Sequence, residues 1–374
     1  MLLFDEMVRA DDTPAKYAET TYNFLNRSSK NESREIREKL ESWFHRYPDS
    51  GKVELYGRFR DKNEYNFQSA FFELFLHELL IKLQCGVNLN PVIEHTPRRP
   101  DFAVRSPQGD EFVLEATLAM DLTKEEMGAE ARKNEVYDAI NRLESPNFFI
   151  GMEIEGSPEQ PPSARKMRSF LTEKLNDLDP DQLTVELERG GLEALPKWRY
   201  EDCGWVLIFS PLPKTREIRG MGGIRPIGIQ MTETKTVTPE IAIRNAILEK
   251  AEAYGSLPVP YLVAVNGLGE FARIDSVYDA LFGDAAVNLR SLGGRAIQTE
   301  PTRSKNGVWN SHEGPHFPNL SGILYLNRMS PWRMDKEDIV FIHNPWTTKP
   351  YHSVLTAFNR ENSAFQEEYG RIEF

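Results

Sequence analysis

The densest run of hydrophobic positions in the chain lies between residues 66 and 86. In NFQSAFFELFLHELLIKLQCG the apolar side chains wrap most of a predicted helix, which Gly86 ends. A helix that is apolar on most of its surface is typical of a buried position. The apolar positions are Phe71, Phe72, Leu74, Phe75, Leu76, Leu79, Leu80 and Leu83.

Strand-like patterns follow this helix. VNLNPVIEH (87–95), DFAVR (101–105) and EFVLEATLA (111–119) are predicted to be strands, and the turn SPQGD joins the last two into a hairpin. A long helical pattern covers 124–146 and another strand pattern covers 147–156. The expected order is therefore helix, three strands, helix and strand.

The remaining chain alternates between polar and apolar blocks. Residues 157–203 are polar, with a proline-rich start, and we interpret them as an insertion or mobile subdomain. A helix is predicted over 238–254 and a hydrophobic strand over 260–267, with further strands at 321–327 and 338–345. We predict an α/β fold with a mixed central sheet.

Four segments are expected from these patterns. Residues 1–60, where hydrophobic positions are sparse, are interpreted as an N-terminal helical extension, and 61–156 as the first part of the core. The insertion occupies 157–203, and 204–374 supplies the rest of the core with a C-terminal elaboration.

Composition narrows the class of protein. The chain has 374 residues, of which 40% are hydrophobic, so it can bury a large core. No apolar run approaches the roughly 18 residues of a membrane span, and the N-terminus lacks the pattern of a signal peptide, so we expect a cytoplasmic protein without membrane contact. A net charge of −12 argues against nonspecific coating of nucleic acid, although a local basic groove remains compatible with it.

Three carboxylates stand out against apolar surroundings. Asp101 follows a proline at the start of one predicted strand, and Glu115 interrupts the apolar run of the partner strand. Glu73 lies within the apolar helix. A buried carboxylate is costly unless a cation or hydrogen bonds compensate it, and Mg²⁺ or Mn²⁺ prefers such hard oxygen ligands. The pattern indicates a candidate metal site.

The combination of Glu73, Pro100-Asp101 and Glu115-Ala116 on helix, strand and partner strand resembles the PD-(D/E)xK nuclease superfamily, which has the restriction-endonuclease-like fold. The resemblance covers about residues 67–156. It implies an αβββαβ core and hydrolysis of phosphodiester bonds with divalent metals. It also implies that Asp101 and Glu115 bind the metal, that the Ala116 carbonyl completes the shell, and that Glu73 supports the metal or its water.

The chain departs from the family at Thr117, where the motif has a lysine that orients the attacking water. Either a lysine from elsewhere takes this place, or the site is degraded. Lys250, on the later helix, is the first candidate because members of the family tolerate such a relocation. Lys133 is the second candidate and Lys124 a poorer third. Thr117 with a bound water is a further candidate for the orienting role.

Each assignment has a simpler alternative. For Asp101 and Glu115 the alternative is a hairpin with surface acids, and for Glu73 it is an ion pair with Arg98 or Arg99. The two arginines are candidate phosphate contacts, although salt bridges to local acids would explain them as well.

Two functions follow from these alternatives. The first is a Mg²⁺- or Mn²⁺-dependent endonuclease that acts on DNA rather than RNA, of the kind found in restriction or phage-defence systems, with a partner protein for target recognition as a further expectation. The second is a nuclease-like module that has lost activity and binds a protein or nucleic acid.

Overall fold

The computed structural model describes residues 1–374 except 157, 232–237, 293–294, 335–337 and 360–374. The chain divides into two compact units. The first unit comprises Met1–Thr13, Thr20–Asp121 and Val237–Phe374, and the second comprises Pro14–Glu19 and Leu122–Thr236. The second unit is thus inserted into the sequence of the first, and each is described separately.

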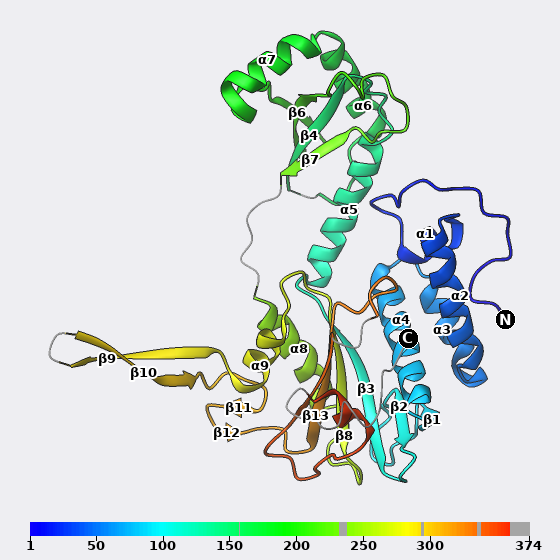
Figure 1. Cartoon of the computed structure of the whole chain (residues 1–374), viewed down its shortest axis with the longest axis vertical. Coiled ribbons are helices and arrows are strands. Elements are labelled where there is room, and N and C mark those ends of the chain that lie inside the picture. The colour runs from blue at the N-terminus through cyan, green and yellow to red at the C-terminus, as the bar shows by residue number, and fades with distance from the viewer. Residues whose placement is uncertain (157, 232–237, 293–294, 335–337, 360–374) are drawn as a thin grey trace. The chain divides into compact units, whose positions relative to one another are not determined.

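The first unit contains the N-terminal helices, the long apolar helix and the main sheet (Figure 1). Its elements are α1 (Thr21–Arg27), α2 (Asn31–Arg46), α3 (Asp49–Phe59), α4 (Glu64–Lys82), β1 (Gly86–Leu89), β2 (Phe102–Arg105), β3 (Glu111–Ala119), α8 (Pro239–Ala251), β8 (Tyr261–Gly267), α9 (Ile274–Phe282), β9 (Ala285–Leu292), β10 (Arg295–Arg303), β11 (Asn310–Ser311), β12 (Gly314–Pro315), β13 (Leu320–Asn327), β14 (Ile339–His343) and the 3₁₀ helix η3 (Val354–Phe358).

Six strands form the main sheet in the order β1-β2-β3-β8-β13-β14. The three central strands β3, β8 and β13 are parallel, and the outer pairings are antiparallel. The predicted mixed sheet and α/β class are therefore confirmed. The parallel pairing of β3 with β8 places Glu115 beside Val263 and Thr117 beside Val265.

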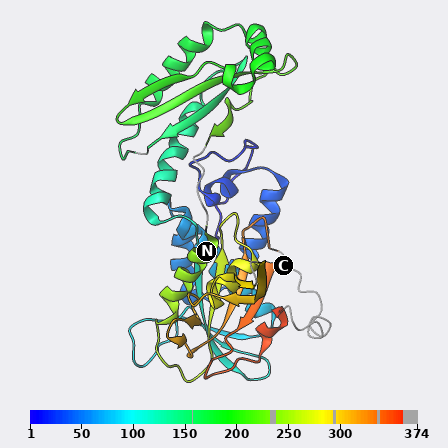
Figure 2. The same cartoon turned by 90° about the vertical axis from the view of Figure 1, so that its left-hand side faces the viewer.

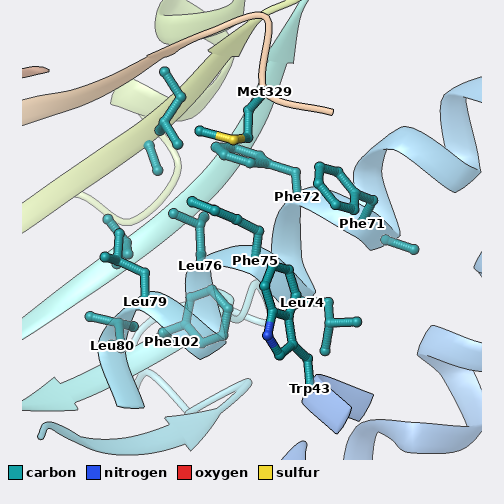
Figure 3. Close-up of a cluster of buried hydrophobic side chains, with 14 of the residues drawn as sticks. Trp43, Phe71, Phe72, Leu74, Phe75, Leu76, Leu79, Leu80, Phe102 and Met329 are labelled. Carbon is teal, nitrogen blue, oxygen red and sulfur yellow. The ribbon is translucent and has the colours of Figure 1, made fainter. Parts of the chain in front are cut away.

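Helix α4 covers one face of this sheet. Alternate residues of β3 point to opposite faces, and Leu114 and Leu118 point toward α4, where they share a core cluster with Phe72 and Phe75. Figure 3 shows the aromatic side chains of α4 gathered between the helix and the strands. The predicted burial of this helix is confirmed, because its phenylalanines are at most 1% exposed.

Helices α8 and α9 cover the opposite face. Val113 and Ala119 of β3 belong to a second core cluster with Ile243 and Ile247 of α8. Glu115 and Thr117 lie between these two positions in the alternation, so their side chains belong to the α8 face. The sequence alternation of β3 therefore directs Glu115 toward α8.

Helices α1 to α3 belong to the core of the first unit. Leu25, Leu40, Phe44 and Phe59 are buried in the same cluster as α4. The sparse hydrophobic positions of residues 1–60 are sufficient because each helix turns one apolar stripe toward α4. The N-terminal segment is thus packed into the first unit rather than appended to it.

The second unit is a smaller α/β unit with a four-stranded sheet. The strands are ordered β5-β6-β4-β7, and helices α5 to α7 pack with its buried side chains in a third cluster. The strands and helices of this unit are green and cyan-green in Figures 1 and 2. Its elements are α5 (Lys124–Ile140), β4 (Phe148–Glu155), α6 (Ala164–Asn176), α7 (Pro180–Gly190), the 3₁₀ helix η1 (Gly191–Ala194), β5 (Trp198–Asp202), β6 (Trp205–Pro213) and β7 (Ile227–Met231).

The expected boundary of the insertion differs from the structure. The main segment of the second unit runs from Leu122 to Thr236, whereas the sequence predicted an insertion over 157–203. The sequence predicted that α5 and β4 belong to the first part of the core (61–156), but both lie in the second unit, where β4 pairs with β6 and β7. A local hydrophobic pattern predicts a strand without specifying its partner strands, and this explains the error.

No helix within the described ranges of the chain has the length and hydrophobicity needed to cross a lipid bilayer.

Candidate functional site

Asp101 lies at the point where β2 begins beside β3. The register pairs Phe102 with Leu114, so the next position places Asp101 opposite Glu115. The Asp101 carbonyl accepts a hydrogen bond from the Asn90 N–H at 3.0 Å, and its carboxylate Oδ2 accepts one from the Ala116 N–H at 2.6 Å. The Asp101 side chain therefore replaces a rung of the β-ladder, which fixes it against β3.

The Glu115 carboxylate is buried between β3 and α8. Its side chain is 7% exposed. Oε1 accepts a hydrogen bond from the Lys250 ammonium at 2.8 Å, and Oε2 accepts one from the Tyr254 hydroxyl at 2.7 Å. The alternative of a surface acid is therefore wrong for Glu115.

Lys250 supplies a positive charge at this site from the last turn of α8. Burial opposes the charged form, but Glu115, with smaller effects of Asp101 and Glu249, outweighs it, and the pKa of Lys250 is raised. The ammonium is therefore charged at neutral pH. The family resemblance made Lys250 the first candidate to replace the motif lysine. The structure brings it to Glu115, while its catalytic role stays a prediction.

Asp101 experiences the charges of its acidic neighbours. Burial raises the pKa of Asp101, and the carboxylates of Glu115 and Glu73 raise it further, whereas the Ala116 N–H and Lys250 act in the opposite direction. A nearby cation would stabilise the ionised form of Asp101. The site is therefore electrostatically suited to attract positive charge.

Glu73 forms its own buried ion pair on α4. The Tyr47 hydroxyl donates to Oε1, and the Arg58 guanidinium donates to Oε2. The partner is thus Arg58, and not Arg98 or Arg99 as the alternative interpretation had it. Both Glu73 oxygens thus accept from protein donors, and the expected support of the metal or its water by Glu73 stays a prediction.

Ala116 and Thr117, which follow Glu115 on β3, contribute different groups: a backbone carbonyl and a side-chain hydroxyl. A residue of a strand directs its N–H and C=O to the same side, so the Ala116 carbonyl faces the side on which Asp101 lies. Thr117 is buried on the α8 face, two residues beyond Glu115. The metal-binding role of Ala116 and the orienting role of Thr117 both stay predictions.

The other candidate basic residues belong to α5 and to the loop before Asp101. Lys133 and Lys124 are in α5, which belongs to the second unit. Arg98 and Arg99 are exposed in the loop that precedes Asp101, and the charge of Arg98 reaches Tyr254, where it acts to lower the pKa of that hydroxyl. Contact of these arginines with phosphate stays a prediction.

Three residues of the site were not found from the sequence. Tyr254 binds Glu115, while Tyr47 and Arg58 bind Glu73. The spacing of Lys250 and Tyr254 would place them one helical turn apart, which was an available signal. Tyr47 and Arg58 precede Glu73 by 26 and 15 positions, and no local pattern links them.

A site for Mg²⁺ or Mn²⁺ requires oxygen ligands that surround the ion. Within the described residues, no group of three or more His, Cys, Asp or Glu side chains is arranged to hold a metal ion. Mg²⁺ commonly binds proteins through one or two carboxylates and retains several waters. Asp101 and Glu115 lie opposite each other, the Glu115 charge raises the pKa of Asp101, and the two carboxylates fit that more limited requirement.

Because His77 is buried, we expect it to make the free energy of unfolding depend on pH. Burial, with a contribution from the Arg46 charge, lowers the pKa of His77 to about 4, and its Nδ1 has no hydrogen-bond partner among the described residues. As pH falls from about 6.5 to 4, the unfolded chain binds a proton that the folded chain excludes. His77 therefore favours unfolding increasingly across this window.

Substitution of His77 by leucine removes that titration. The free energy of unfolding of the His77→Leu variant, relative to wild type, is expected to rise by about 3 kcal/mol between pH 7 and pH 4. Urea denaturation at several pH values measures this difference. A difference that is constant with pH would contradict the buried neutral state of His77, and His45→Leu, at an exposed position, is the matched control.

Comparison with known proteins yields no relative: no family model, no curated protein and no solved structure matches the chain.

Proposed function

We propose that this chain is a divalent-metal-dependent nuclease that hydrolyses phosphodiester bonds, with DNA as its expected substrate. The observation that carries the proposal is the group formed by Asp101, Glu115 and Lys250. Two carboxylates lie opposite each other on adjacent strands, and the ammonium lies 2.8 Å from one of them. Carboxylates and an ammonium are the groups that phosphodiester hydrolysis with Mg²⁺ requires.

We also propose the restriction-endonuclease-like fold for the first unit. Its elements α4, β1, β2, β3, α8 and β8 follow one another in the αβββαβ order once the second unit is set aside as an insertion between β3 and α8. This order supports the proposal with α8 and β8 in the places that the sequence had given to α5 and β4.

In this proposal each side chain has a distinct role. Asp101 and Glu115 would hold the metal ion, together with the Ala116 carbonyl. A bound Mg²⁺ or Mn²⁺ would lower the pKa of a water and offset negative charge on the phosphate. Lys250 would take the role of the missing motif lysine and orient the water. The Thr117 hydroxyl is neutral and cannot supply the positive charge of the motif lysine, so we assign the role of orienting the water to Lys250.

The test is an assay of the purified full chain on supercoiled plasmid, linear duplex DNA, single-stranded DNA and RNA. Each substrate is incubated with Mg²⁺, with Mn²⁺ and with EDTA. We expect DNA cleavage with either metal and none with EDTA. No cleavage of any substrate, together with no Mn²⁺ binding by calorimetry, would contradict the proposal.

Contaminating nucleases are excluded by a matched pair of variants. Asp101→Asn/Glu115→Gln keeps the shape of both side chains and removes their charge. Glu111→Gln removes an exposed carboxylate from the same strand β3. Cleavage that survives in the double variant would contradict the site, whereas Glu111→Gln should cleave like wild type.

A second candidate function is a nuclease-like binding module without activity. The observation that favours it is that Lys250 and Tyr254 occupy both oxygens of Glu115. A carboxylate neutralised by protein donors has less need of a metal. Under this alternative the chain would bind DNA or a partner protein with equal affinity in EDTA and in Mg²⁺.

A further inference from the structure

The hydroxyl of Tyr254 contacts the same carboxylate as Lys250 but differs from it in rigidity. A lysine ammonium lies at the end of a flexible four-carbon stem, whereas a tyrosine hydroxyl is placed by two torsions and by the packing of its ring. Tyr254 donates to Glu115 Oε2 at 2.7 Å and is itself 8% exposed. Of the two donors, the tyrosine is the one that can fix the orientation of the carboxylate.

The fold holds Tyr254 in place from two sides. Its ring packs edge-to-face against Tyr261 with the centroids 5.5 Å apart. Tyr261 in turn donates its hydroxyl to the Lys250 carbonyl at 2.9 Å, which ties the end of α8 to the first residue of β8. The helix ends at Ala251, and Gly255 follows with φ +62, a backbone conformation that suits glycine. Gly255 therefore turns the chain directly after Tyr254, on the way from α8 to β8.

Electrostatics keep Tyr254 a hydrogen-bond donor. Burial raises the pKa of the Tyr254 hydroxyl, and the Glu115 charge raises it further. An ionised carboxylate only accepts hydrogen bonds, so the hydroxyl 2.7 Å from Oε2 acts as the donor. By contrast, Oε1 accepts from the ammonium at the end of the flexible Lys250 stem, a partner that another cation can replace.

We infer that Tyr254 is a positioning residue that fixes the Glu115 carboxylate through Oε2 and leaves Oε1 for the exchange between Lys250 and a divalent cation. The inference rests on the proposed function. Hydrogen bonds that orient metal-binding side chains commonly change metal affinity by about 10- to 100-fold when they are removed. The loss of Tyr254 should therefore weaken metal binding without removing any ligand.

The experiment compares the Tyr254→Phe variant with wild type in the full chain. Calorimetry with MnCl₂ is expected to show an affinity about tenfold weaker. The Mn²⁺ concentration for half-maximal DNA cleavage should rise by a similar factor, while the rate at saturating Mn²⁺ stays within about threefold of wild type. A role confined to fold stability would not shift the metal requirement in this way.

The matched control is Tyr325→Phe. Tyr325 is fully buried, and its hydroxyl has no hydrogen-bond partner among the described residues, so its removal should leave Mn²⁺ affinity unchanged. Wild-type cleavage with equal Mn²⁺ affinity in Tyr254→Phe would overturn this inference alone. Neither cleavage nor Mn²⁺ binding in wild type would overturn the proposed function and the inference together.

Discussion

Substitution of Lys250 by methionine is expected to lower the rate of DNA cleavage by about 1,000-fold, the upper end of what the loss of one preorganised donor costs an enzyme. Methionine preserves most of the volume of the stem and removes the charge. The ammonium that contacts Glu115 at 2.8 Å is then missing, and the water would no longer be oriented. Initial rates on linear duplex DNA at saturating Mg²⁺ measure the loss.

The same variant separates catalysis from stability. Glu115 is buried and would keep Tyr254 as a hydrogen-bond donor, so the Lys250→Met protein should lose stability but remain folded at assay temperature. Lys62→Met, at an exposed position, is the control and should cleave normally. Cleavage by Lys250→Met at more than a tenth of the wild-type rate would contradict the assigned role.

Relocation of the charge extends this test. Thr117 lies two residues after Glu115 on the same face of β3, at the position where the PD-(D/E)xK motif has lysine. The double variant Lys250→Met/Thr117→Lys should therefore cleave DNA at least about tenfold faster than Lys250→Met alone. Recovery would show that the two positions supply the same function.

Substitution of Arg58 by methionine is expected to destabilise the first unit by about 3 kcal/mol. Removal of one partner from a buried ion pair leaves an uncompensated charge, and this typically costs about 3–5 kcal/mol. The Glu73 side chain is 9% exposed and the Arg58 side chain is 24% exposed, which favours the lower end. The midpoint and slope of urea unfolding measure the change.

A double-mutant cycle identifies the cause. Arg58→Met/Glu73→Leu removes both charges and should be more stable than Arg58→Met alone, because no buried charge is left unpaired. Lys52→Met, which breaks an ion pair with the exposed Asp49, should cost much less than Arg58→Met. Strict additivity of the Arg58 and Glu73 substitutions would contradict a coupled buried pair.

Local patterns predicted the elements that hold the site. The alternation of 111–119 matched β3 at both ends, and the apolar run that includes Phe72 and Leu76 matched the buried helix α4. These successes share a physical reason: burial on one or both faces imposes a period on the sequence itself. The acids were recognisable because a carboxylate within such a run is costly without a partner.

Local patterns did not predict the hydrogen-bond partners of Glu115 and Glu73. Lys250 was chosen by analogy, and its contact with Glu115 joins residues 135 positions apart. Tyr254 and Arg58 were not identified, because their hydrogen bonds depend on where α8 and α3 pack. The expected insertion began too late for the same reason, since the pattern of β4 fits either sheet and its pairing with β6 is nonlocal.

By itself the sequence determined that Asp101 and Glu115 would lie near each other on neighbouring strands and that Glu115 would be buried, because a hairpin and an alternating strand are local structures. The tertiary structure alone decided which cation and which hydroxyl meet Glu115, and that Glu73 pairs with Arg58. Long-range packing sets those contacts, and no short segment of the chain contains the information for them.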